Sequence, residues 1–328
     1  MIDLLKGRTT ENNIRREDMI LEINRLRKEK NAVILAHYYQ ESDVQDLADF
    51  VGDSLQLSQQ AAKTSADVIV FAGVHFMAET AKILSPRKTV LLPDLNAGCS
   101  LADSCNASDF KVFLDKYPDH TVISYVNTTA EIKAMTDIIC TSSNALAIVN
   151  SVPSTEKIIF APDKNLGNYI KSLSGRDMVI WDGACHVHER FSLEKIGHLK
   201  NENPDAKIIA HPECEKPVLI ISDFIGSTAA LLRFIEKDDA KVYIVCTESG
   251  ILHQMKKSKP EKIFIPAPPN DSTCACNDCQ FMKLITVEKI YESLLQNKFE
   301  IKLDENIRLK AERPIKRMLE ISEKMGFK

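Results

Sequence analysis

The stretch Val33-Ile34-Leu35-Ala36-His37-Tyr38-Tyr39 opens with apolar residues and ends in a histidine and two tyrosines. The same order returns in Val122-Ile123-Ser124-Tyr125-Val126-Asn127 and in Ile208-Ile209-Ala210-His211-Pro212-Glu213. Short apolar runs that alternate with helical periodicity are typical of the strands in a parallel α/β sheet. We therefore interpret these stretches as the first strands of three similar units.

A second and a third apolar run follow in each unit, and a proline comes directly after every third run: residues 67–71 and 91–92, 137–140 and 160–161, and 241–246 and 264–265. Beyond each third run comes a cysteine, namely Cys99, Cys185 or Cys279, at 66, 63 and 71 residues from Val33, Val122 and Ile208. Three cysteines thus occupy equivalent places. Chance is the alternative explanation, because nine cysteines are scattered along the chain.

These repeats predict an α/β fold of three similar three-layer domains, with short parallel sheets arranged around a pseudo-threefold axis. Helical periodicity predicts additional helices at both ends of the chain. The expected boundaries are an N-terminal helical segment 1–30, domains 31–115, 116–200 and 201–284, and C-terminal helices 285–328.

The predicted terminal helices have recognisable limits. Residues 12–30 carry apolar side chains at helical spacing. Thr286 should cap a helix that runs to about Asn297, and a last helix should run from about Glu305 to Lys324. Pro314 should kink that helix or start a new turn.

Composition and charge point to an enzyme that acts on small molecules. The 328 residues are 44% hydrophobic and 27% charged, and 42 basic against 46 acidic residues give a net charge of −4. A nucleic-acid or anionic-membrane partner would favour a net basic chain. The sequence has no apolar run long enough for a membrane span and no signal-peptide pattern, so we expect a cytoplasmic protein.

The three equivalent cysteines favour a metal centre over disulfides. They lie 86 and 94 residues apart, whereas structural zinc sites usually take four ligands, often in CxxC pairs. A [4Fe–4S] cluster held by three cysteines leaves one iron free to act as a Lewis acid. Cys276 and Cys279 form a CxxC beside Cys274, so a local zinc site or a redox pair remains an alternative.

Polar side chains at the strand ends could surround such a centre. The pairs His37 and Tyr39, Tyr125 and Asn127, and His211 and Glu213 each lie two residues apart, so both members point to one side of an extended chain. Glu213 is the candidate general base. Hydroxyls where strands give way to helices could bind carboxylate or phosphate: Ser54, Ser142, Ser227 and Thr228.

Each of these residues also has a structural explanation. A histidine at a strand end can simply be hydrogen-bonded within the fold, and Ser227 with Thr228 can be an ordinary helix cap. Recurrence in three units favours a functional role.

Common nucleotide-binding and hydrolase motifs are missing. The sequence contains no GxG pair, no GxxxxGK[ST] loop and no GxSxG.

Longer strings in the chain closely resemble one family, the quinolinate synthases of bacteria and archaea. The likeness covers roughly residues 30–320. It is carried by AHYYQ at 36–40, VQDLAD at 44–49, GDSL at 52–55, FAGVHFMAET at 71–80, PDLNAGCS at 93–100, YVN at 125–127, TSSN at 141–144, WDGACHVH at 181–188, HPEC at 211–214, GST at 226–228 and CQFMK at 279–283.

The resemblance implies three α/β domains and a [4Fe–4S] cluster on Cys99, Cys185 and Cys279. It implies that iminoaspartate (iminosuccinate) condenses with dihydroxyacetone phosphate, losing phosphate and two waters, to give quinolinate for NAD biosynthesis. An L-aspartate oxidase or dehydrogenase would supply the iminoaspartate. The open iron would bind substrate and assist the late dehydration.

Residue roles follow from the same resemblance. Glu213, Tyr39 and His37 would be catalytic, with Glu213 and Tyr39 moving protons. Gln280 stands where many members have proline, which puts only the local turn in doubt. The substrates would be bound by His37, Ser54, Tyr125, Val126, Asn127, Ser142, His211, Pro212, Glu213, Ser227 and Thr228.

Two other functions remain open at this point. One is a different cluster-dependent hydro-lyase that acts on a small dicarboxylate. The other is a non-catalytic metal-binding or redox-sensing protein that uses Cys276 and Cys279.

Overall fold

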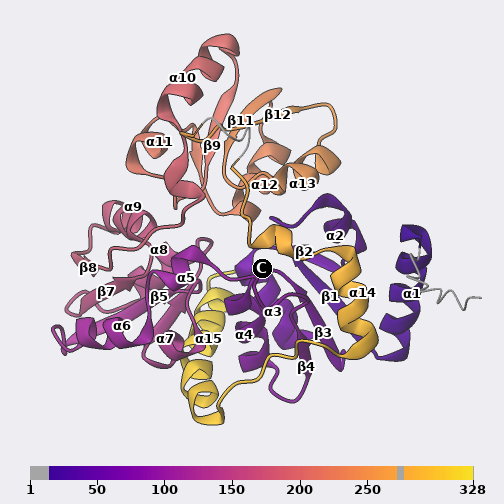
Figure 1. Cartoon of the computed structure of the whole chain (residues 1–328). Coiled ribbons are helices and arrows are strands. Elements are labelled where there is room, and N and C mark those ends of the chain that lie inside the picture. The colour runs from indigo at the N-terminus through magenta and orange to yellow at the C-terminus, as the bar shows by residue number, and fades with distance from the viewer. Residues whose placement is uncertain (1–14, 272–276, 328) are drawn as a thin grey trace, which may run out of the picture.

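The computed structural model describes residues 15–271 and 277–327. Within them, three parallel sheets of four strands each form three separate lobes (Figure 1). Each sheet places its strands in the same order, second, first, third, fourth. The α/β fold of three similar domains is therefore confirmed.

The strands of the three sheets match one another in sequence order. The first sheet runs β2-β1-β3-β4, the second β6-β5-β7-β8 and the third β10-β9-β11-β12. Their bounds are β1 (Ala32–His37), β2 (Phe50–Gly52), β3 (Val68–Ala72) and β4 (Thr89–Leu91); β5 (His120–Tyr125), β6 (Ile138–Cys140), β7 (Lys157–Ala161) and β8 (Met178–Ile180); and β9 (Lys207–Ala210), β10 (Phe224–Ile225), β11 (Val242–Cys246) and β12 (Ile263–Pro266).

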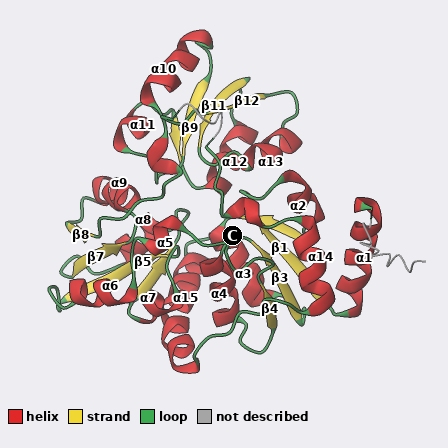
Figure 2. Cartoon of the chain, viewed as in Figure 1, coloured by secondary structure: helices red, strands yellow, loops and turns green. Residues whose placement is uncertain are grey.

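Helices flank the sheets (Figure 2). Those that connect the strands are α2 (Ser42–Leu47), α3 (Ser54–Lys63) and α4 (His75–Leu84); α7 (Ala130–Ala134), α8 (Ala145–Ser151) and α9 (Lys164–Ser174); and α11 (Lys216–Ile220), α12 (Thr228–Lys237) and α13 (Ile251–Ser258). One further helix precedes each first strand: α1 (Arg16–Glu29), α6 (Ala107–Leu114) and α10 (Leu193–Glu202).

The C-terminal helices lie as the sequence predicts. α14 (Val287–Gln296) begins after Thr286, whose hydroxyl accepts from the Lys289 N–H, and ends at Asn297 in the left-handed region. α15 (Glu305–Lys324) continues through Pro314. It packs against α4 and α7, so it joins the first two domains.

In the second domain, the second and third predicted runs were matched with the wrong strands of the other two domains. Residues 137–140 contain β6, the counterpart of β2, and residues 160–161 end β7, the counterpart of β3. The strands β2, β8 and β10 were not predicted, because runs of two or three residues carry no periodic signal. The cysteine alignment survives, since each cysteine still follows the fourth strand of its domain.

None of the helices in the described part of the chain has the length and apolar character needed to span a bilayer.

Candidate metal centre and active site

Residues from all three domains line one cavity at the carboxyl ends of the strands. Its lining combines apolar side chains with a set of polar groups, which suits small-molecule reactants. The structure thus brings most predicted site residues together: His37, Tyr39, Ser54, Cys99, Tyr125, Asn127, Ser142, Cys185, His211, Glu213, Thr228 and Cys279.

The three cysteines share one local structure. Each lies just before a short helix: α5 (Ser100–Asp103), η1 (His188–Arg190) and η2 (Met282–Leu284). Backbone N–H groups at the start of these helices donate to the sulfurs: those of Leu101 and Ala102 to Cys99, of His188 to Cys185, and of Phe281 and Met282 to Cys279. Such N–H groups favour the thiolate, the form that binds metals.

The electrostatics of the three thiols favour the binding of a cation. Burial raises the pKa of each one. The charge of Cys279 raises the pKa of Cys99 further. The charges of Cys99 and Cys279 likewise raise the pKa of Cys185. Three thiolates that line one cavity repel one another unless positive charge lies between them. The donor set therefore fits a metal ion or an iron–sulfur cluster.

The other described cysteines do not take part, because Cys105, Cys140, Cys214 and Cys246 are buried and do not line the cavity. The alternative of a CxxC pair rests on Cys276, which, like Cys274, lies outside the described residues.

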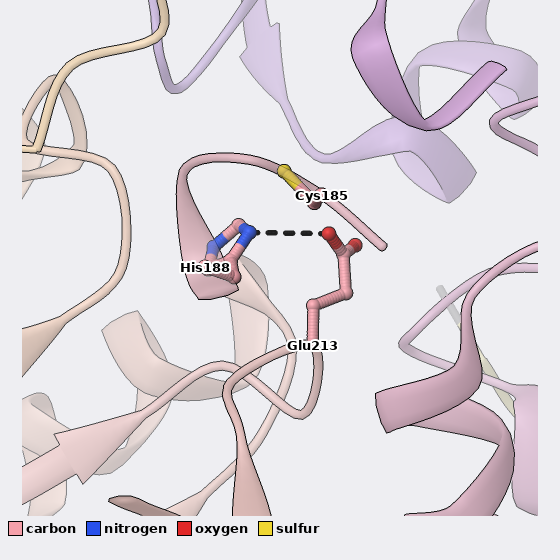
Figure 3. Close-up of side chains that lie close together, drawn as sticks. All are labelled: Cys185, His188 and Glu213. Atoms are coloured by element: carbon pink, nitrogen blue, oxygen red, sulfur yellow. Dashed lines mark ion pairs between the residues drawn. The ribbon is translucent and has the colours of Figure 1, made fainter. Parts of the chain in front are cut away.

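A second compact group adjoins the cysteines. Ligand atoms of Cys185, His188 and Glu213 all lie within 4.8 Å of one another (Figure 3). Two members of this group already bind each other, since His188 Nδ1 lies 3.1 Å from Glu213 Oε2. We therefore interpret His188 and Glu213 as acid–base groups next to the metal site.

Glu213 is an ionised carboxylate in the wall of the cavity. The Tyr125 hydroxyl donates to its Oε1 at 2.5 Å, and His211 Nδ1 lies 3.7 Å from the same oxygen. Burial alone would raise the pKa of Glu213, but His188 and the Tyr125 hydroxyl more than offset this and hold the pKa below its usual range.

A series of polar contacts runs from Glu213 to Tyr39. His188 Nδ1 lies 3.1 Å from Glu213 Oε2, outside hydrogen-bond geometry, and with the ring proton on Nδ1 the Nε2 atom can accept from the Thr247 hydroxyl, 2.9 Å away. Thr247 Oγ1 lies 2.6 Å from the Tyr39 hydroxyl. Burial raises the pKa of Tyr39 well above its ordinary value, so this hydroxyl stays protonated and can donate. The arrangement places the hydroxyls of Tyr39 and Thr247 and the ring of His188 in one row of contacts.

Comparison with known proteins places the chain. The family model of the quinolinate synthetase A protein matches residues 21–320. The chain belongs to this family. It is 62% identical over 306 residues to the quinolinate synthase of Microcystis aeruginosa, covering 93% of this chain and 96% of that protein. It is also 60% identical over 305 residues to that of Thermosynechococcus vestitus, with the same coverage, and 57% identical over 310 residues to that of Chloroherpeton thalassium, covering 94% and 96%. The resemblance seen in the sequence is therefore confirmed.

Two histidines of this quinolinate synthetase A family member present neutral N–H donors. The Tyr39 N–H donates to His37 Nδ1 at 3.2 Å, and the Glu213 N–H donates to His211 Nδ1 at 3.4 Å. The ring proton must then be on Nε2. Burial lowers the pKa of both histidines to about 3, so neither carries charge at neutral pH. His211 Nε2 lies 3.1 Å from Ser142 Oγ.

Some predicted residues have other places in the structure. Ser227, Val126 and Pro212 do not line the cavity. Ser227 instead caps α12, where its hydroxyl accepts from the Ala230 N–H at 3.3 Å. The prediction missed His188, Thr247 and Glu248. Glu248 and Thr247 directly follow β11, so a search of the third strand ends would have found them.

Proposed function

We propose that this chain is a quinolinate synthase, which condenses iminoaspartate (iminosuccinate) with dihydroxyacetone phosphate and releases phosphate and two waters. Its place is de novo NAD biosynthesis, in the cytoplasm. The observation that carries the proposal is the convergence of Cys99, Cys185 and Cys279 on a cavity that also holds a proton path, in a chain of the quinolinate synthetase A family.

Cys99, Cys185 and Cys279 would hold a [4Fe–4S] cluster, whose fourth iron has no protein ligand and supplies a Lewis acid for dehydration. This assignment is supported by the count of ligands, because these three are the described cysteines that line the cavity.

The neutral donors of the cavity suit a dicarboxylate substrate. His37 and His211 carry their protons on Nε2, and Ser54, Ser142 and Thr228 add hydroxyl groups at the same wall. Charge-assisted hydrogen bonds to carboxylates are strong, and these donors need no proton uptake to form them.

Asn127 supplies the complementary group. Its Oδ1 is buried and has no hydrogen-bond partner among the described residues. An orphaned buried acceptor of this kind calls for a donor from a ligand. The imine N–H of iminoaspartate is such a donor, which would fix the orientation of that substrate.

Proton transfer would use the path from Tyr39 to Glu213. The Tyr39 oxygen can take up a proton from the substrate while its own proton passes to Thr247 and the Thr247 proton passes to His188 Nε2. The Glu213 carboxylate stabilises positive charge on His188, as the orienting acid does in other relays. Tyr125 holds Glu213 in place by its short hydrogen bond.

The test is an assay under strict exclusion of oxygen, in which an L-aspartate oxidase or dehydrogenase generates iminoaspartate in the presence of dihydroxyacetone phosphate. We expect quinolinate from the wild type, and Glu213→Gln should keep its iron but make little quinolinate. Iron-loaded protein that instead dehydrates a hydroxydicarboxylate and forms no quinolinate would support the rival hydro-lyase and overturn the proposal.

A further inference from the structure

A buried ion pair lies beside the metal site and takes no part in the proton path. Glu248 is fully buried and lines the cavity, two residues beyond the end of β11. Its Oε1 lies 2.9 Å from Nζ of Lys283, which is within η2. Burying two charges is costly unless further hydrogen bonds satisfy them, so the partners of this pair are informative.

The carboxylate of the pair holds the third cysteine. Glu248 Oε1 accepts from the backbone N–H of Cys279 at 3.2 Å, and Oε2 accepts from the N–H of Gly250 at 2.7 Å. Both oxygens are thus used, and one of them fixes the peptide group that carries the Cys279 thiol.

Asp163 occupies the equivalent place in the second domain, two residues beyond its third strand, β7. Its Oδ1 accepts from the Leu166 N–H at 2.7 Å, and its Oδ2 has no hydrogen-bond partner among the described residues. In the first domain the equivalent position is Val74. Of these three equivalent positions in the described chain, Glu248 is therefore the one whose side chain accepts from a cysteine N–H.

The ammonium of the pair holds the catalytic tyrosine. Lys283 Nζ donates to the backbone carbonyl oxygen of Tyr39 at 3.0 Å and lies 3.5 Å from Glu41 Oε1. Tyr39 follows β1 of the first domain, whereas Glu248 follows β11 of the third. One ion pair therefore connects the backbone of Tyr39 to the backbone of Cys279.

We propose that the Glu248 and Lys283 ion pair is a positioning clamp that fixes the third cysteine ligand and Tyr39 relative to each other. The proposal rests on the proposed function, since it assumes that Cys279 binds the cluster and that Tyr39 transfers protons. Loss of either partner should loosen the metal ligand, because Lys283 holds the carboxylate oxygen that accepts from the Cys279 N–H.

The experiment is a double-mutant cycle on iron release. The holoprotein is purified without oxygen, and the transfer of iron to a chelator is followed by absorbance in the wild type, Glu248→Ala, Lys283→Met and the double variant. Residues that support metal ligands typically change metal affinity by about 10- to 100-fold, so each single variant should release iron at least about tenfold faster. The double variant should be no faster than the faster single variant, because both act through one clamp.

The chain offers a matched control. Lys289 Nζ lies 2.6 Å from Asp94 Oδ2 and donates to the Leu284 carbonyl oxygen, yet it does not line the cavity. Lys289→Met should release iron within roughly twofold of the wild type. In a steady-state assay, Lys283→Met should lower kcat with little change in KM, and Lys283→Arg should restore most of the loss.

Each result decides the matter. Iron release from Lys283→Met at the wild-type rate, or multiplicative effects in the double variant, would overturn the clamp while leaving the proposed function intact. A wild type that holds no iron would overturn both. If Glu248→Ala and Lys283→Met fail to fold, Glu248→Gln and Lys283→Arg are compared instead. The clamp requires faster iron release from Glu248→Gln and near-normal iron release from Lys283→Arg. Equal rates of iron release from these two variants would overturn the clamp.

Discussion

Replacing Thr247 by valine removes the central hydroxyl of the proton path and preserves the shape of the side chain. Thr247 is buried, and its Oγ1 lies 2.6 Å from the Tyr39 hydroxyl and 2.9 Å from His188 Nε2. Leaving a buried polar group unpaired costs about 1–3 kcal/mol, so two such groups should lower the free energy of unfolding by about 2–6 kcal/mol. Positioned acid–base groups contribute about 10²- to 10⁴-fold in rate, and kcat should fall within that range.

The assay measures quinolinate formation, iron content and urea unfolding of Thr247→Val in parallel. Thr136→Val is the control, since the buried Thr136 hydroxyl also makes two contacts, with Ser124 Oγ and the Ile132 carbonyl oxygen, both at 2.8 Å and away from the cavity. We expect similar destabilisation from both variants, normal iron in both and a loss of kcat in Thr247→Val alone. A Thr247→Val enzyme with kcat within roughly threefold of the wild type would refute the proton path.

Two other predictions concern stability and backbone position. A Cβ at Gly250 would lie 2.8 Å from backbone atoms of Tyr39, so Gly250→Ala should displace that tyrosine and lower both kcat and the free energy of unfolding. Gly197 in α10 has open space around the position of a Cβ, so Gly197→Ala should stabilise the protein by about 0.5–1 kcal/mol in thermal unfolding. Burial lowers the pKa of His37 and His211 from 6.5 to about 3, so the folded state binds fewer protons than the unfolded chain below pH 6.5 and stability falls as the pH drops from there towards 3. Each histidine should cost about 2 kcal/mol at pH 5, and urea unfolding at pH 7 and pH 5 should show a smaller loss for His211→Gln than for the wild type, while an equal loss would contradict the assignment.

The sequence predicted the parts of the site that follow from regular structure. Parallel strands bring their carboxyl ends to one edge, so residues such as His37, Tyr125 and His211 could be placed in a shared cavity from the repeat alone. The equivalence of the cysteines followed from the same repeat. Three of the edge strands, β2, β8 and β10, were missed because they are very short; β10, for example, contains only two residues.

The proton path and the clamp could not be predicted in this way. Tyr39 and Thr247 are 208 positions apart in the sequence, and His188 and Thr247 are 59 apart. Their contacts arise from the packing of different domains and leave no local spacing to detect. The partner of Lys283 is also hidden, because Glu248 follows a strand of the third sheet while the lysine lies in a short helix, and no periodicity of the sequence links the two.

The most direct test of the central claim is the iron and acid-labile sulfide content of protein purified without oxygen. The account predicts about four irons and four sulfides per chain in the wild type and in Cys105→Ala, whose cysteine is buried away from the cavity, and loss of the cluster in Cys99→Ala, Cys185→Ala and Cys279→Ala. Wild-type protein that holds a single zinc, or a full cluster in any of the three ligand variants, would contradict it.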